Sequence, residues 1–351
     1  MAQYRSTGNL DTAVVEFRDR LNLARLQQLL QGFGRVRVLV VGDLTLDEFV
    51  TGRTERISRE APVLILRHET TQRVPGGGAN ATYNLARLGA QVQSVGLLGD
   101  DEQGQALREL FAGVGVDTSG IVTVPGRPTV TKTRISGHAR QSVTQQIVRL
   151  DRKSDELPAS AIQQQLAQQV GDRLSTVDAV VCSDYNEGVF WGEPVIPAAL
   201  AAPFTVVDAQ RDLGRYRGAT LFTPNLPEAE LASGVTIRDE ASLQQAAQTL
   251  FQQTQAQHLL ITRGEDGMSL FAADGTVAHI PAFNRTQVFD VTGAGDTVVA
   301  ALSLAIAAGG TVWEGAVLGN LAASIVVRQF GTTTTTVAEM ETALTTLLEE
   351  S

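Results

Sequence analysis

The chain has 351 residues, 43% hydrophobic and 19% charged, which is typical of a globular protein with ample material for a core, in one large domain or two smaller ones. A formal net charge of −10 argues against a nucleic-acid partner, because such binding relies on clustered Lys and Arg. The single cysteine, Cys182, excludes an internal disulfide. The N-terminal segment lacks the apolar run of a signal peptide, and the apolar stretch 298–308 is too short to span a bilayer. We therefore expect a soluble, cytoplasmic protein with no membrane partner.

The first predicted element is an amphipathic helix over residues 11–32, where leucine and other apolar side chains recur at helical spacing. We assign residues 1–34 to an N-terminal helical extension and residues 35–345 to the main domain. Within that domain, short apolar runs predict buried strands at 35–43, 91–99, 177–185, 204–209 and 258–264. Helical patterns lie between them at 79–88, 102–114, 161–174 and 241–253. This alternation predicts an α/β fold, a three-layer αβα sandwich around a central, mostly parallel sheet.

Two segments, 49–73 and 129–150, break this alternation because their residues alternate with a period of two. They predict strands outside the main sheet. Each leaves from the carboxyl end of a central strand, where ligands of open α/β sheets bind, so we expect them to form a small β-sheet lid. A small sheet also leaves an apolar face and open edges, which favour pairing with a second copy in a homodimer. The side chains expected near that contact are Val63, Ile65, Val130 and Ile135.

The segment 289–310 contains a glycine-rich turn followed at once by a long helix of small apolar residues. Gly293 and Gly295 permit backbone conformations that other residues avoid. The backbone N–H groups of Gly293, Ala294, Gly295 and Asp296 are therefore expected to converge on an anion at the helix N-terminus. Asp296 could accept a proton from a substrate hydroxyl. By itself, the turn favours the plainer interpretation, in which Asp296 simply caps a buried helix.

The turn resembles the DTxGAGD signature of the ribokinase/PfkB carbohydrate kinases, and further segments similar to that family follow in the same order across residues 35–345. The resemblance implies a ribokinase-like fold and transfer of the γ-phosphate of ATP to a sugar hydroxyl. Asp296 would be the general base, and the Gly293–Gly295 turn would stabilise the transferred phosphoryl group.

The same resemblance assigns residues to the sugar. In the segment 74–89, Gly76, Gly77 and Asn80 match family residues that contact sugar hydroxyls. A loop that caps a helix would also explain the glycines, but it is indifferent to Asn80. After the first strand, Asp47 matches the sugar-binding aspartate better than Asp43 does. Asp184, at the carboxyl end of the strand 177–185, is a further candidate for contact with the substrate.

Other segments are similar to the nucleotide site of the family. Asn225 and Glu228 match its N-x-x-E motif, which implies that Glu228 holds Mg²⁺ through water, although the pair also fits a helix capping box. Thr262, Arg263 and Gly264 would lie along the nucleotide, and Gly267 would allow a tight return between two strands. Asn320 would border the adenine base. Taken alone, the segment 259–271 reads as a β-hairpin.

A K⁺ site is also implied by the resemblance. The matching ligands are Asp290, Thr292, the backbone of Val326, Gln329 and Gly331, and Thr335.

Within the family, several segments resemble the kinase domain of the ADP-heptose pathway, which phosphorylates D-glycero-β-D-manno-heptose 7-phosphate at the anomeric hydroxyl. They include residues 42–66, 126–135, 147–151 and 182–190. Arg59, Arg134 and Arg149 could bind the phosphate that this substrate carries, or could equally be solvated strand residues. The chain departs from SDYAKG and DPKG of that subfamily, with SDYNEG at 183–188 and DAQR at 208–211, and loses a lysine at each place. Another sugar or sugar phosphate therefore stays open as the substrate.

Two other classes of protein fit the sequence less well. A nicotinamide-dependent oxidoreductase should show G-x-G-x-x-G after the first strand, where this chain has GDLTLD. A non-catalytic sugar-binding protein on the same fold is harder to exclude, but the intact turn at 293–296 and the Asn225/Glu228 pair argue for an enzyme. No second domain follows residue 351, so we expect the adenylyltransferase half of fused relatives to be absent.

Overall fold

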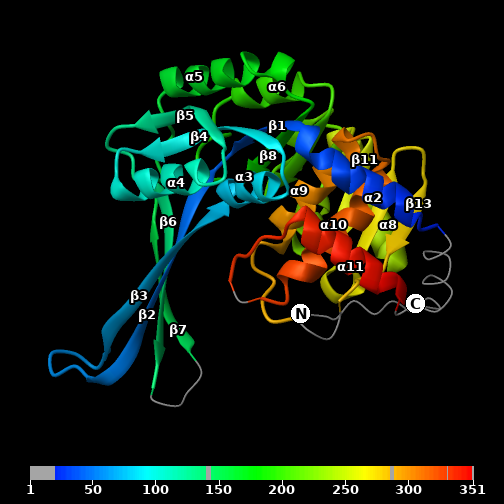
Figure 1. The fold of residues 1–351 in the computed structure, drawn as a ribbon. Helices are drawn as coiled ribbons and strands as arrows, with labels where there is room; N and C mark the ends of the chain where they lie inside the picture. The colour runs from blue at the N-terminus through cyan, green and yellow to red at the C-terminus, as the bar shows by residue number, and fades with distance from the viewer. Residues whose placement is uncertain (1–19, 140–143, 285–287, 330, 350–351) are drawn as a thin grey trace.

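The structure is a computed structural model that describes residues 20–139, 144–284, 288–329 and 331–349 (Figure 1). Much of the predicted leading helix, with the rest of residues 1–19, lies outside the described residues. The part that is described becomes helical only at Leu23, because the side chain of Asn22 accepts a hydrogen bond from the Arg25 N–H at 3.0 Å and so caps the helix.

The main sheet has the strand order β13-β12-β11-β10-β9-β8-β1-β4-β5. All neighbours pair in parallel except β11–β12 and β12–β13, which are antiparallel. This confirms the mostly parallel central sheet and all five predicted strands. The strand bounds are β1 Arg37–Gly42, β4 Gln91–Gly99, β5 Asp117–Val124, β8 Ala179–Asp184, β9 Thr205–Ala209, β10 Leu221–Phe222, β11 His258–Thr262, β12 Met268–Ala272 and β13 Val277–Ile280.

Helices cover both faces of this sheet, which is why its strands read as continuous apolar runs. In β1, Val38 and Val40 face one core, while Leu39 and Val41 face the other. The first core is formed with α2 Leu23–Gly32, α3 Gly78–Arg87, α4 Glu102–Ala112, α9 Ala294–Ala307, α10 Val312–Val326 and α11 Val337–Glu349. The second is formed with α5 Ser160–Gly171, α6 Val195–Leu200, α7 Leu226–Ser233 and α8 Glu240–Thr254. Among the described residues, no helix has both the length and the apolar character needed to cross a membrane.

The second sheet is the lid, defined here as β2 Leu44–Ile57, β3 Leu64–Gly77, β6 Val130–His138 and β7 Gln145–Arg152, in the order β3-β2-β6-β7. It extends as a long arm from one end of the main sheet (Figure 1). The pairing of the two predicted lid segments is confirmed, since β2 and β6 are neighbours and run parallel. The first strand begins earlier than residue 49, because β2 follows β1 after Asp43 alone.

Candidate active site

The site lies where the strand order of the main sheet reverses. In the sheet, β1 has β4 as its neighbour on one side and β8 on the other, and the chain fills the β4 side first and the β8 side later. The carboxyl ends of β1 and β8 therefore border a crevice, where open α/β sheets bind ligands. Asp43 follows β1, and Asp184 ends β8. Three segments meet there: the start of α3, the turn before α9 and the base of the lid.

Asp296, in the first turn of α9, is almost fully buried, with 3% of its surface exposed. The Asn80 side-chain amide donates to its Oδ2 at 2.7 Å, and the Tyr185 hydroxyl donates to its Oδ1 at 3.0 Å. Burial raises the pKa of Asp296 to about 7, an effect that these two hydrogen bonds and Lys132 oppose and the Asp47 charge adds to. The carboxyl thus exchanges its proton near neutral pH, as a general base requires.

A buried chain of hydrogen bonds joins α3 to α9 and holds this carboxylate. The Thr297 hydroxyl donates to Asn84 Oδ1 at 3.0 Å, the Asn84 amide donates to Asn80 Oδ1 at 3.0 Å, and the Asn80 amide donates to Asp296. Asn80, which we predicted to contact the sugar, therefore also orients the Asp296 carboxylate. Because each buried group has a partner, the network fixes one geometry.

The predicted turn starts α9 as expected. Gly293 adopts a left-handed φ of 77°, and a Cβ there would lie 2.7 Å from Asn80 Nδ2, so the close approach to α3 requires glycine. A Cβ on Gly295 would meet nothing within 4 Å, which leaves open space in front of the turn. The Ala294 N–H donates to the Val291 carbonyl at 3.2 Å.

The base of the lid brings the other predicted sugar residues to the same place. Asp47 is buried, and its Oδ1 lies 2.9 Å from Arg134 Nη1 on β6. Gly76 lies against this carboxyl, since a Cβ at that position would be 2.8 Å from Asp47 Cγ. Gly77 adopts a φ of 53° where β3 passes into α3, beside Tyr185.

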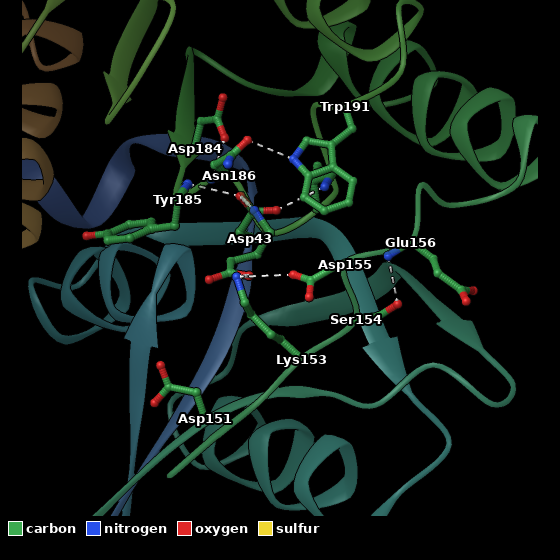
Figure 2. A network of polar contacts seen from close by, with 12 residues as sticks. Asp43, Asp151, Lys153, Ser154, Asp155, Glu156, Asp184, Tyr185, Asn186 and Trp191 are labelled. Atoms are coloured by element: carbon green, nitrogen blue, oxygen red, sulfur yellow. Dashed lines mark hydrogen bonds and ion pairs between the residues drawn. The ribbon is translucent and has the colours of Figure 1, made fainter. Parts of the chain in front are cut away.

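Two further carboxylates, those of Asp43 and Asp184, accept hydrogen bonds from other groups of the protein (Figure 2). Asp43 accepts backbone hydrogen bonds from Tyr185, Glu187 and Val189 at 2.9–3.0 Å. Burial, with the neighbouring Asp184 charge, raises the pKa of Asp43 to about 7 although these N–H groups oppose the shift. Asp184 accepts from the Asn186 N–H at 2.8 Å and from the Tyr216 hydroxyl at 2.7 Å. Both oxygens of the predicted substrate residue Asp184 thus already have partners, and its contact with substrate stays a prediction.

The expected nucleotide residues occupy the strand ends farther along the sheet. Asn225 and Glu228 form a reciprocal capping box at the start of α7, with both bonds at 2.9 Å. Thr262 bridges to Asn225, and its N–H donates to the Pro224 carbonyl at 3.0 Å.

The remaining residues predicted to bind the nucleotide lie on the hairpin from β11 to β12 and on α10. The buried Arg263 donates to the Asp266 carbonyl within its own turn, which also contains Gly264. Gly267 has a φ of 83°, and a Cβ there would collide with the Ile280 carbonyl. Asn320 on α10 donates to the Pro281 carbonyl at 2.7 Å.

Several residues predicted for a K⁺ site lie near one another. Asp290 Oδ1 accepts from the Thr292 N–H and hydroxyl at 2.9 and 2.7 Å, and Oδ2 accepts from the Gly331 N–H at 3.0 Å. The Val326 carbonyl accepts from the Thr333 hydroxyl at 3.2 Å. The Thr335 hydroxyl contacts Glu339 instead, and Gln329 is exposed.

Sequence reasoning missed three residues of the site. The first two are Tyr185, which donates to Asp296, and Lys132, whose Nζ lies 5.6 Å from the centre of the Tyr185 ring. The third is Asp208 on β9, whose pKa is raised well above its ordinary value by burial and by the charges of Asp296 and Glu228. Tyr185 and Lys132 lie in segments that resemble the heptose kinases, which was the available signal, whereas Asp208 lies in DAQR, where the chain departs from that subfamily. Among the described residues, no group of three or more His, Cys, Asp or Glu is arranged to hold a metal by itself.

Comparisons with known proteins agree with this geometry. The chain is 44% identical over 326 residues to "Bifunctional protein HldE" of Trichlorobacter lovleyi, covering 91% of this chain and 65% of that protein. It is also 44% identical over 312 residues to "Bifunctional protein HldE" of Geobacter metallireducens, covering 87% and 62%. The chain thus spans less than two thirds of the length of these relatives.

Similar solved structures include Arabidopsis thaliana ribokinase complexed with ribose and ATP, with a TM-score of 0.69, 20% identity and coverage of 90% of this chain and 99% of that one. Another is Escherichia coli phosphofructokinase-2 in complex with potassium, with a TM-score of 0.71, 20% identity and coverage of 89% and 99%. Both support the ribokinase-like fold. Residues 36–339 match the family model described as pfkB family carbohydrate kinase. The chain therefore belongs to the pfkB family of carbohydrate kinases.

Proposed function

We propose that the protein transfers the γ-phosphate of ATP to the anomeric hydroxyl of D-glycero-β-D-manno-heptose 7-phosphate, with Asp296 as general base. The observation that carries the proposal is the position of Asp296, a buried carboxylate with a pKa near 7 at the start of α9, beside the open backbone at Gly295 and across from Asp47. The identity to two proteins named HldE supports the choice of a heptose.

In this proposal Asp296 takes the proton of the attacking hydroxyl, and Asp47 accepts hydrogen bonds from other hydroxyls of the sugar. Gly76 has no side chain, which lets the backbone of β3 pack directly against the Asp47 carboxyl and hold it in place. The backbone at Gly293, Gly295 and Asp296, with the positive end of the α9 dipole, stabilises charge on the phosphoryl group in transit, whereas the Ala294 N–H is already bound to the Val291 carbonyl. The lid covers the sugar and excludes water, which would otherwise compete as the acceptor.

The donor set fits ATP with Mg²⁺. The pKa of Glu228 is raised mainly by burial, and Asp208 lies near enough for its own pKa to rise through the Glu228 charge. Two desolvated carboxylates side by side are stabilised by a cation, and Mg²⁺ needs few protein ligands when it keeps its waters and binds nucleotide phosphates. Thr262, Arg263, Gly264, Gly267 and Asn320 would then line the nucleotide.

Arg134 is the arginine best placed for the substrate phosphate. Its guanidinium is mostly buried and points to Asp47. Arg149 is ion-paired with Asp151 on β7, and Arg59 is exposed at the far end of the hairpin between β2 and β3. Where the heptose kinases have a lysine in SDYAKG, this chain has Glu187, whose carboxylate lies 3.5 Å from Lys153. Lys153 thus places a positive charge close to Glu187, the position at which SDYAKG has its lysine.

We also propose a homodimer formed through the lid. Large apolar side chains are exposed along it, including Ile57, Val63, Leu64, Ile147, Val148 and Leu150. Ile65, Val130 and Ile135 are partly exposed on the same sheet. A sheet with apolar side chains and open edges is stabilised by pairing with a second copy.

The test is to incubate the purified chain with ATP and Mg²⁺ and follow the product by ³¹P NMR. Heptose 7-phosphate should yield a second phosphate, coupled to the anomeric proton, while ribose, fructose 6-phosphate and free heptose should react far more slowly. Equal turnover of free heptose, or preference for another sugar, would redirect the proposal to that substrate. Binding of sugar and ATP without product would favour the non-catalytic alternative.

A further inference from the structure

We propose that Tyr185 is a positioning residue for the catalytic base, and that Asp43 holds Tyr185 in place through the backbone of the loop after β8. This inference deepens the proposed function, because it assigns a role to residues at the same site. It rests on three contacts, which run from Asp43 to the loop, from Tyr185 to Asp296 and from the lid to Tyr185.

The first contact fixes the loop. Asp43 is 2% exposed and receives three N–H groups from residues 185–189, so one carboxylate gathers five residues of backbone around the end of β1 (Figure 2). Asn186 has a positive φ of 58°, and its side chain accepts from the Trp191 indole at 2.8 Å, which braces the bend that follows Tyr185. The direction of the Tyr185 side chain is therefore set by Asp43.

The second contact places the hydroxyl. Tyr185 donates to Asp296 Oδ1 at 3.0 Å, while Asn80 donates to Oδ2 at 2.7 Å. Two donors on the two oxygens fix the plane of the carboxylate and leave one lone pair on each oxygen for the substrate. A donor also stabilises the ionised form, which is the form that accepts a proton.

The third contact comes from the lid. Lys132 on β6 lies over the Tyr185 ring, with Nζ 5.6 Å from the ring centre, which is within the range of a cation–π interaction. Tyr185 is thus enclosed between the lid, the loop and α9. On the other side of the loop, Arg127 donates to the Glu187 and Glu156 carbonyls at 3.1 and 2.7 Å and joins the loop to the segment after β7.

Besides the Tyr185 hydroxyl, several charged side chains face Asp296. Removal of the Tyr185 hydroxyl leaves all of these charges on the protein. They are Asp47 from β2, Lys132 from β6 and Asp208 from β9. Glu228 from α7 acts on Tyr185 and Asp208. Substituting Tyr185→Phe changes only one hydrogen bond and keeps the ring under Lys132.

The test compares pH profiles of kcat for the wild type and Tyr185→Phe at saturating ATP. Loss of the Tyr185 hydroxyl as a donor should move the acidic limb of the kcat profile to higher pH by about one unit. This corresponds to a tenfold change in the ionisation equilibrium of Asp296. Turnover should fall roughly fivefold or more at pH 7 and recover largely at pH 9, with the KM for ATP unchanged. A merely structural tyrosine would lower kcat equally at every pH.

The matched control is Tyr216→Phe, which removes another buried hydroxyl, the one bound to Asp184 at 2.7 Å, and should leave the limb in place. Asp43→Asn should shift the limb in the same direction as Tyr185→Phe, and the double variant should shift it no further. An unmoved limb in Tyr185→Phe, or additive shifts in the double variant, would overturn the inference.

A measurement without substrate separates this inference from the proposed reaction. In protein labelled with ¹³C at the aspartate carboxyls, the signal of Asp296 is the one lost in Asp296→Asn. Its titration should move to higher pH in Tyr185→Phe and stay unchanged in Tyr216→Phe. That result would support the positioning role even if heptose 7-phosphate proves not to be the substrate, and an identical titration in all three proteins would exclude it. If Tyr185→Phe does not fold, Asp43→Asn is measured in the same way.

Discussion

Replacing Asp296 by Asn should make the protein more stable and nearly inactive. Burial raises the pKa of this carboxyl to about 7 from the ordinary 3.8. At pH 8 the folded protein therefore holds a desolvated charge that the unfolded chain solvates freely. With about 1.4 kcal/mol per pKa unit, the penalty is up to about 4 kcal/mol.

The sign of the pH dependence follows from the raised pKa. The penalty is fully present above about pH 7 and has mostly disappeared at pH 4, because the folded carboxyl is then protonated and the unfolded one, with its ordinary pKa of 3.8, is close to half protonated. Asn is neutral at every pH. Its Oδ1 can accept from Asn80, and its Nδ2 can donate to the Tyr185 oxygen, so both hydrogen bonds survive. The variant should exceed the wild type in stability at pH 8 and equal it near pH 4.

The assay is thermal unfolding at several pH values, with kcat measured in parallel. At about 2.1 cal/mol/K per residue, 351 residues give an unfolding entropy of about 0.7 kcal/mol/K, so Tm should rise by up to about 6 °C at pH 8. Turnover should fall roughly 10²-fold or more, since the amide accepts no proton, while nucleotide binding remains.

The control is Asp290→Asn, because Asp290 shifts in the opposite direction. Burial raises its pKa, but hydrogen bonds from Thr292 and Gly331 outweigh this effect and lower it. That variant should lose stability above about pH 4 rather than gain it. The reasoning is refuted if Asp296→Asn is less stable than the wild type at pH 8, or if it keeps near-normal kcat.

Three other predictions concern the substrate phosphate, the cation and the assembly. Arg134→Ala should raise the KM for heptose 7-phosphate roughly tenfold or more, because it removes a charge-assisted contact, whereas Arg149→Ala should not; equal effects would contradict the assignment of Arg134. KCl should raise activity and NaCl should substitute poorly at constant ionic strength, since K⁺ would order the turn before α9. Equal activity in KCl and NaCl would contradict the proposed cation site. Sedimentation analysis should find a dimer at micromolar concentration that Ile65→Asp dissociates, and a wild-type monomer or an unaffected dimer would exclude assembly through the lid.

The sequence predicts the main sheet well, because the cause of each strand is local. A strand buried on both faces must be apolar throughout, and Val38 to Val41 meet that condition while serving two different cores. Helix caps are local as well, which explains the success at Asn225 and Glu228. The lid could also be predicted, because the period-two alternation of its residues differs from the continuous apolar runs of the main sheet.

The hydrogen-bond partners of Asp296 could not be predicted in the same way. Asn80 and Asp296 are 216 positions apart, and Tyr185 and Asp296 are 111 apart, so no spacing within one element reports these contacts. Resemblance to the family selected Asn80 for the sugar, whereas the structure also gives it a hydrogen bond to Asp296. Asp208 was overlooked because a lone aspartate in a strand carries no pattern that links it to Glu228.

The parallel pairing of β2 with β6 constrains the order in which the chain folds. The hairpin of β2 and β3 is local and can form early, but β6 is synthesised only after β4, α4 and β5. Until then the outer edge of β2 exposes unpaired N–H and C=O groups beside apolar side chains, which is the condition that favours aggregation. We expect chains that end before residue 130 to be insoluble, and refolding yields to depend on how quickly β6 reaches that edge.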